Sequence, residues 1–177
     1  MKITYLTSHE LFLEQLMYSS SISKHANTTR IRNRWILSLL PLAIGIYETL
    51  QTRNYLVVIF MLFMALAFYF FYPIYSRWRY GRHFKKVIAT DFKERLDQKV
   101  HLSITNDSLE ITESASAASI KFEEIIALVE LNNIFAIQLK SGQLLPVPKG
   151  DISETLAFIR MFENRGVEHV DKNGWKW

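Results

Sequence analysis

From Tyr55 to Tyr75 the chain runs for 21 residues without a charge, and these residues are almost all apolar. As an α-helix this stretch would be about 31 Å long, which matches the roughly 30 Å hydrocarbon core of a bilayer. A helix that is apolar on all sides needs cover on all sides, and a chain of 177 residues has little other material to supply it. The stretch therefore predicts a membrane span over about residues 55–75.

The preceding segment, residues 35–52, predicts a second span although it contains Ser38, Pro41 and Gly45. Pro and Gly are tolerated in membrane helices because neighbouring helices and local adjustments satisfy the backbone groups that they free. Residues 51–54 then form a tight turn, so we expect a two-helix transmembrane hairpin over residues 35–76. A single span would leave the basic clusters on either side of it in opposite compartments.

Basic residues set the expected orientation of this hairpin, since they favour the cytoplasmic side of a membrane. The outer turn carries Arg53 alone. The other end carries Lys24, Arg30, Arg32 and Arg34 before the first span, and Arg77, Arg79, Arg82, Lys85 and Lys86, here called the basic foot, after the second. We therefore predict a protein of the bacterial inner (cytoplasmic) membrane with both termini in the cytoplasm. The basic foot either orients the anchor or also attracts anionic lipid headgroups.

Glu48 is the only acidic residue among residues 24–86. One interpretation places its carboxylate at the membrane interface, paired with Arg53. The other makes it an intramembrane polar site that faces inward in an oligomer, because charged groups within a bilayer often serve transport.

The charge of the remaining chain argues against nucleic acid as a partner. Residues 87–177 hold ten basic and fourteen acidic residues, although the whole chain has a net charge of +4. A nucleic-acid-binding domain carries positive charge on its own folded surface. The absence of cysteine excludes disulfides, thiolate catalysis and cysteine-based zinc sites.

The segments that flank the hairpin predict cytoplasmic structure. Residues 1–34 read as a short strand followed by a helix that begins near Ser8. Its polar face carries Glu10 and Glu14, which favours packing against a globular domain over binding to a membrane surface. Residues 77–98 comprise the basic foot and a connecting helix, with apolar side chains at three- and four-residue spacing.

Residues 99–166 predict a small antiparallel sheet of about five strands followed by a helix, an α+β arrangement. Asn106-Asp107 and Asn132-Asn133 mark turns, and residues 114–119 are predicted to form a loop of small residues. The final helix is expected over 152–165, with a capping box at Asp151 and Glu154. Residues 167–177 read as a short, poorly ordered tail.

Pro146 and Pro148 predict that the last strand lies at a sheet edge or ends there, because proline cannot donate to a strand ladder. An exposed edge accepts an added peptide strand. We therefore single out Pro146, Pro148 and Lys149 as a possible partner-binding edge.

The order of these segments resembles the YcxB-like family of bacterial membrane proteins. The resemblance rests on two membrane helices, the segment "IKFEEIIALVELNNIFAIQL" and the closing run "LLPVPKGDI". It implies a C-terminal domain similar to bacterial pleckstrin-homology-like (PH-like) modules over residues 99–166. Phe122 stands where the family often has Trp, and the family has no settled activity.

No motif in the sequence names a reaction. The five histidines are dispersed, and the glycines form no phosphate-binding or dinucleotide-binding loop. We expect no catalytic residue, metal or cofactor, and a non-enzymatic membrane protein that presents a PH-like interaction module. Its expected partners are membrane lipids and either a second protein or further copies of itself. The alternatives are a small oligomeric transporter or channel subunit, and a module that senses anionic lipid through the basic foot.

Overall fold

The computed structural model describes residues 1–105, 107–113 and 117–177. It divides into two compact units, one formed by Met1–Ser19 with Phe84–Trp177 and the other by Ser20–His83. We call the first the module and the second the helical unit. The module contains two four-stranded sheets, and within the described residues the chain is α+β, as predicted.

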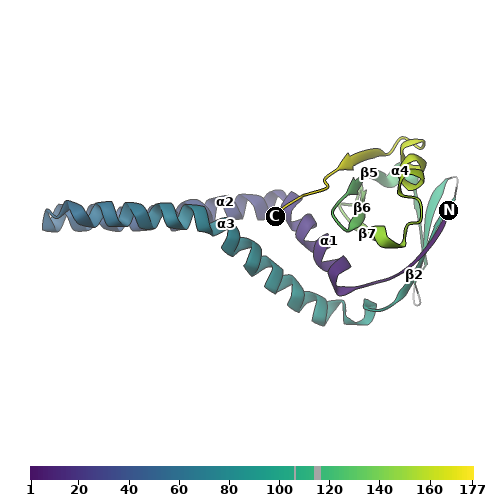
Figure 1. The fold of residues 1–177 in the computed structure, drawn as a ribbon, viewed down its shortest axis with the longest axis horizontal. Helices are drawn as coiled ribbons and strands as arrows, with labels where there is room; N and C mark the ends of the chain where they lie inside the picture. Colours follow the sequence, from purple (N-terminus) through teal and green to yellow (C-terminus); the bar gives the residue numbers. More distant parts are fainter. Residues whose placement is uncertain (106, 114–116) are drawn as a thin grey trace. The chain divides into compact units, whose positions relative to one another are not determined.

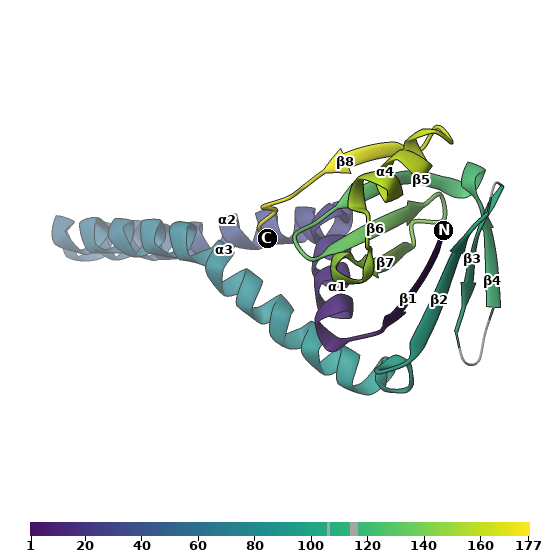
Figure 2. The same cartoon turned by 45° about the vertical axis from the view of Figure 1, so that its right-hand side comes forward.

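The first sheet of the module has the strand order β1-β2-β3-β4 and is antiparallel throughout (Figure 2). Its strands are β1 (Lys2–Leu6), β2 (Lys99–Ile104), β3 (Ser108–Thr112) and β4 (Ala117–Lys121). The N-terminal strand pairs with β2 along its whole length, from Lys2 opposite Ser103 to Leu6 opposite Lys99. The N-terminal strand therefore shares one sheet with residues 99–121, from which the helical unit separates it in the sequence.

Part of this sheet differs from the loop that we predicted over residues 114–119. Residues 117–119 belong to β4. Residues 114–116, and Asn106 of the predicted Asn106-Asp107 turn, lie outside the described residues. The loop prediction is wrong at residues 117–119 because Ala and Ser have no strong strand preference, and pairing with β3 decides their conformation.

The second sheet has the order β7-β6-β5-β8. Its strands are β5 (Ile125–Glu130), β6 (Ile134–Leu139), β7 (Leu144–Pro148) and β8 (Glu168–Asp171). The predicted turn at Asn132-Asn133 is confirmed, because β5 and β6 form an antiparallel pair on either side of it. β8 lies parallel to β5, so residues expected as a tail extend the sheet.

Short helices complete the module. α1 (His9–Ile22) begins after Ser8, whose hydroxyl accepts a hydrogen bond from the backbone N–H of Leu11 at 3.1 Å and so caps the helix. α4 spans Thr155–Glu163, which is shorter than predicted. The predicted capping box is wrong: Glu154 is the N-cap but makes no side-chain cap bond, and Asp151 belongs to a 3₁₀ turn. The 3₁₀ turns are η1 (Lys93–Arg95), η2 (Phe122–Glu124) and η3 (Lys149–Asp151).

Aromatic side chains from both the second sheet and α4 form the centre of the module core. Phe135, Phe158 and Phe162 are fully buried. The ring of Phe158 lies 5.2 Å from that of Phe135 and 5.0 Å from that of Phe162. Phe122 adds an edge contact to Phe162 at 5.6 Å. Such pairs each contribute about 0.5–1.5 kcal/mol beyond area burial, so they fix α4 on the sheet.

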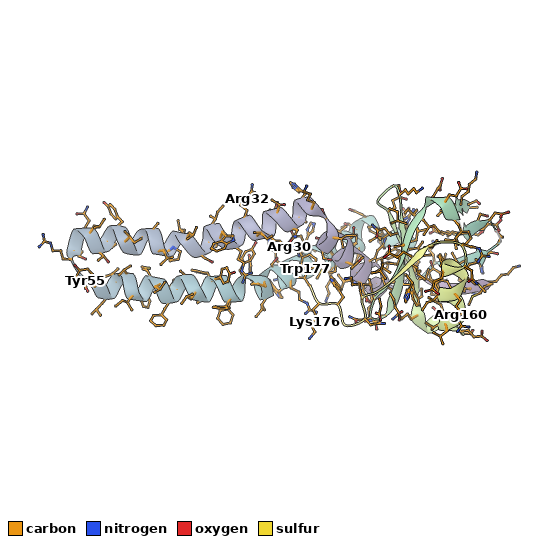
Figure 3. The ribbon with its side chains drawn as sticks, turned by 90° about the horizontal axis from the view of Figure 1, so that it is seen from above. Arg30, Arg32, Tyr55, Arg160, Lys176 and Trp177 are labelled. Carbon is orange, nitrogen blue, oxygen red and sulfur yellow. The ribbon has the colours of Figure 1, made fainter. Side chains whose placement is uncertain are left out.

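The helical unit consists of two antiparallel helices, α2 (Lys24–Thr52) and α3 (Tyr55–Asp91), of which α3 continues into the module (Figures 1 and 3). The turn between them contains Arg53 in a left-handed conformation, and the side chain of Asn54 accepts a hydrogen bond from the N–H of Leu56. The buried residues of α2 are small: Ser38, Pro41 and Gly45. A Cβ atom on Gly45 would lie 2.7 Å from Cβ of Met61, so the helices approach closely here.

α3 is the one helix in the described part of the chain that is long and apolar enough to cross a membrane. In its most apolar stretch of 18 residues, only 6% of the residues are buried. α2, expected as a second span, does not meet the same test, because polar residues interrupt its apolar sequence. Its outer face is nevertheless apolar: Ile36, Leu40 and Ile46 are each more than half exposed.

Candidate functional site

A groove of about 670 Å³ in the module, here called the module groove, has mixed polar and apolar walls. Side chains from β1, α1, the first sheet and the β6–β7 hairpin line it. Its apolar wall includes Leu16, Phe92 and Ile120. Its charged groups are Arg95, Glu113 and Glu124. Convergent polar groups in an apolar hollow are typical of a binding site.

Strand β7 forms one wall of the module groove and is the edge strand of its sheet. Two of its carbonyl groups already accept hydrogen bonds from side chains outside the sheet. Tyr5 Oη donates to the carbonyl oxygen of Pro146 at 3.1 Å, and Gln15 Nε2 donates to that of Leu144 at 2.5 Å. Pro146 and Pro148 have no N–H to offer. A peptide strand that added at this predicted edge would therefore have to displace both side chains.

The electrostatics of Tyr5 keep it a hydrogen-bond donor. Burial, and secondarily the carboxylate of Glu113, raise the pKa of the Tyr5 hydroxyl far above its usual range. The phenol therefore stays protonated and keeps its bond to Pro146. Beside it, Oε1 of Gln15 is buried and has no hydrogen-bond partner among the described residues. This oxygen is an acceptor that a ligand in the groove would satisfy.

Lys149, the third residue of the predicted edge, belongs to a polar cluster. Its ammonium lies 2.8 Å from Oε1 of Glu130 and 2.7 Å from Oδ1 of Asn173. His169 Nε2 lies 3.0 Å from the other oxygen of Glu130, and Asn173 Nδ2 donates to Oε1 at 2.8 Å. The cluster links β5, η3, β8 and the C-terminal segment.

Glu130 is the centre of this cluster, with 13% of its side chain exposed. Burial by itself would raise its pKa. Hydrogen bonds from Lys149, Asn173 and His169, together with the charge of Lys149, outweigh burial and lower the pKa of Glu130 below its usual range. The sequence contained no signal for this cluster, because its members are far apart in the chain and meet only through the pairing of β5 with β8.

The basic foot lies along α3. Its side chains do not gather into one ion-paired cluster: no ion pair joins any of them among the described residues. The guanidinium of Arg82 lies 4.7 Å from the ring of Trp78. Arg79 lines a cleft between α2 and α3. Arg77, Lys85 and Lys86 are exposed.

Glu48 is exposed near the end of α2. Within the described residues its carboxylate forms no ion pair, with Arg53 or any other group. Its backbone oxygen accepts a hydrogen bond from Thr52 Oγ1 at 2.8 Å. The structure therefore does not bring the carboxylate of Glu48 together with its predicted partner, Arg53.

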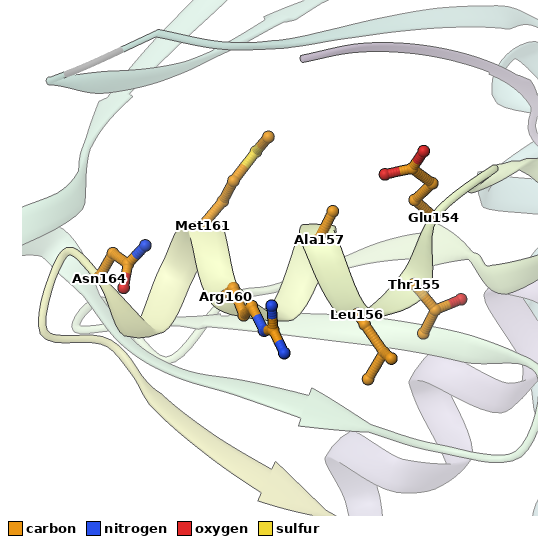
Figure 4. Close-up of a pocket in the computed structure, with 7 residues that line it drawn as sticks. All are labelled: Glu154, Thr155, Leu156, Ala157, Arg160, Met161 and Asn164. Carbon is orange, nitrogen blue, oxygen red and sulfur yellow. The ribbon is translucent and has the colours of Figure 1, made fainter.

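A third hollow lies over α4, and all its lining residues come from this helix and its ends (Figure 4). Glu154, Ala157 and Met161 point to one side of the helix, whereas Leu156 and Arg160 point to the other. The side chains diverge and do not face a common point. This surface lacks the convergent groups of a specific site.

Within residues 1–105, 107–113 and 117–177, no group of three or more acidic, His or Cys side chains is placed to hold a metal ion. Neither the family models nor the curated proteins nor the solved structures contain a match to this chain.

Proposed function

We propose that this protein is an integral protein of the bacterial inner membrane whose helical hairpin anchors a non-enzymatic PH-like interaction module at the cytoplasmic face. One observation carries the proposal: large apolar side chains are exposed on α2 between Ile31 and Leu50 and on α3 between Tyr55 and Trp78. Phe60, Phe63 and Phe70 are each more than 60% exposed. Soluble proteins rarely expose such extensive apolar surface, whereas lipid would cover it.

The packing of the hairpin supports two spans. Membrane helices associate through small residues that let their backbones approach, and α2 buries Ser38, Pro41 and Gly45 against α3. Since α2 and α3 pair in this way, α3 entering a bilayer would carry α2 with it. The basic residues before α2's apolar segment and those after α3's lie at the same end of this antiparallel pair, which supports cytoplasmic termini.

The strand order of the module supports the PH-like assignment and the resemblance to YcxB-like proteins. One sheet has the order β1-β2-β3-β4, the other contains β5, β6 and β7 in sequence, and a helix follows them. On this proposal the hairpin is inserted between the first and second strands of the module. The N-terminal strand is then part of the recognition module and not a separate arm.

The module groove is the surface through which we expect the module to bind. Its apolar wall, the acceptor oxygen of Gln15 and the carboxylates of Glu113 and Glu124 favour an amphipathic ligand that donates hydrogen bonds. The groove contains no arrangement of a nucleophile with an adjacent base among its described residues, so a binding role fits it better than catalysis.

Site-directed cysteine labelling tests this proposal, because the natural chain has no cysteine. We suggest Gln51→Cys at the outer turn, Phe63→Cys in the middle of the apolar part of α3 and Gly150→Cys on the module. In intact spheroplasts a membrane-impermeant maleimide should label only Q51C. Lysis should expose G150C, and F63C should react only after detergent is added. Labelling of G150C in intact cells, or extraction of the protein by alkaline carbonate, would refute the proposal.

A further inference from the structure

The helical unit contains a cleft of about 310 Å³ between α2 and α3, here called the hairpin cleft. It lies at the end of the hairpin that carries the basic residues. Arg30 and Asn33 come from one face of α2. Tyr72, Ser76, Arg79 and His83 follow at intervals of three and four residues along one face of α3.

Side chains of the hairpin cleft favour an anion. Arg30 and Arg79 supply guanidinium groups, and Asn33 and Ser76 supply neutral donors. None of the described residues that line the cleft is acidic. Arginine presents several N–H groups in a planar fork that matches phosphate oxygens, so this set is chemically suited to a phosphate group.

Ser76 provides an independent observation. Its side chain lines the cleft, the residue is only 4% exposed, and its hydroxyl has no hydrogen-bond partner among the described residues. A serine within a helix can bond to the carbonyl four residues earlier, as Ser38 does to Arg34 at 2.8 Å. A buried hydroxyl without a partner is unfavourable, and a ligand oxygen in the cleft would satisfy it.

Apolar surface adjoins the cleft directly. Tyr75 lines the cleft and is 49% exposed, and Phe68, seven residues earlier on the same side of α3, is 43% exposed. A ligand whose phosphate enters the cleft would therefore contact apolar side chains with the rest of its body. This is the arrangement that a lipid requires, with a charged headgroup and acyl chains.

We propose that the hairpin cleft is a specific site for the phosphate of an anionic phospholipid headgroup. The site rests on the membrane insertion proposed above, because insertion brings the cleft to the depth of the headgroups. Arg30 and Arg79 hold the phosphate from α2 and α3, and the hydroxyl of Ser76 donates to one of its oxygens. The bound lipid joins the two helices at their basic end.

The test measures lipid that the purified full chain retains in detergent, by native mass spectrometry, after exposure to mixed vesicles of phosphatidylglycerol and phosphatidylcholine. Arg79→Gln and Ser76→Ala remove single contacts. Arg32→Gln is the matched control, because it removes one positive charge from the same end of the hairpin as Arg79→Gln. Arg32 points away from α3, whereas the cleft residue Arg30 lies on the side of α2 that faces α3 (Figure 3). R79Q should retain about tenfold less phosphatidylglycerol, S76A should retain several-fold less, and R32Q should match the natural protein.

An equal loss in R32Q and R79Q would overturn the proposal, since it would show diffuse attraction to the basic end. Equal retention of phosphatidylcholine and phosphatidylglycerol would also overturn it. A separate arm adds inorganic phosphate: complete displacement of lipid at millimolar phosphate would assign the cleft to a soluble anion instead of a lipid. Cysteine labelling of the same variants separates these outcomes from a failure of membrane insertion, because lost binding with unchanged labelling concerns the cleft alone.

Discussion

Arg34 on α2 donates a hydrogen bond from Nε to the backbone carbonyl oxygen of Tyr69 on α3, at 3.0 Å. That carbonyl has no helical partner, because the residue four positions later is Pro73, which lacks an N–H. The same guanidinium lies 3.7 Å from the centre of the Tyr69 ring. Arg34 thus satisfies the backbone group that Pro73 leaves open, which gives a residue of the predicted orienting cluster a structural role.

Replacing Arg34 by Met should destabilise the hairpin by about 1–3 kcal/mol, because it leaves the Tyr69 carbonyl without a donor. In a Pro73→Ala background the cost should be smaller, since alanine at this position supplies the helical N–H. Unfolding of the four proteins in bicelles, analysed as a double-mutant cycle, measures this coupling. Equal costs of R34M in both backgrounds would contradict the relationship between Arg34 and Pro73.

Gly45 should be intolerant of any side chain. A Cβ atom there would lie 2.7 Å from Cβ of Met61 and 3.3 Å from Cα of Val58, so Gly45→Ala must force α2 and α3 apart. We expect a loss of about 1–3 kcal/mol by the same unfolding assay. Gly81→Ala is the control, because a Cβ on Gly81 would meet nothing within 4 Å. G81A should be neutral or stabilise α3 by up to about 1 kcal/mol.

The Glu130 cluster should make the module sensitive to acid. Its folded pKa lies below the ordinary value of 4.5, so the stability contributed by ionised Glu130 is fully present above pH 4.5 and is lost as pH falls through the folded pKa. Glu130→Gln should therefore destabilise the module at neutral pH, and the difference from the natural protein should shrink in acid. Urea titrations between neutral pH and about pH 3 measure this difference.

Glu168→Gln serves as the control for the acid experiment, because Glu168 is an exposed residue on the neighbouring strand β8. Its substitution should shift the urea midpoint little at any pH. A difference between E130Q and the natural protein that stayed constant across the whole acid range would show that packing, and not the charge of Glu130, explains the loss.

Tyr5→Phe should loosen the edge strand β7. The substitution removes the hydroxyl that donates to Pro146 and leaves that buried carbonyl unbonded, at a cost of about 1–2 kcal/mol. Amide hydrogen exchange in β6 should accelerate, because β7 protects that strand. Thr4 lies on the same strand β1 as Tyr5, and its hydroxyl forms an exposed hydrogen bond with His101 of β2. Thr4→Val removes this bond and should have little effect. Unchanged exchange in Y5F would show that Tyr5 does not hold the edge.

Local patterns predicted the elements that local physics dominates. Short apolar runs on either side of Asn132-Asn133 predicted β5 and β6, because both strands are almost wholly buried and Asn suits the turn between them. The apolar stretch from Tyr55 predicted α3, and Ser8 predicted the start of α1. Such signals lie within a few residues of each other, so no distant contact is needed to produce them.

The sequence predicted less well the elements whose conformation depends on residues far away in the chain. The tail that contains β8 has weak local preference, and it forms a strand because β5 offers an unpaired edge. The candidate binding residues show the same limit. Arg30 and Ser76 meet only because α2 and α3 pack together, although Ser76, Arg79 and His83 already share one helical face in the sequence.

The amino-acid sequence by itself determined which helical segment is apolar on all sides and where the basic residues cluster. It also determined in which segments apolar residues recur at the spacing of a strand or of a helix. Those properties established the long apolar helix, its basic end and the strands of the module other than β4 and β8. Tertiary structure decided that β1 joins β2 across the inserted hairpin, that Tyr5 and Gln15 occupy the β7 edge, and that Arg34 bonds to the carbonyl opposite it. The physical reason is that these contacts join groups remote in sequence, whose hydrogen bonds are specified by geometry and not by local preference.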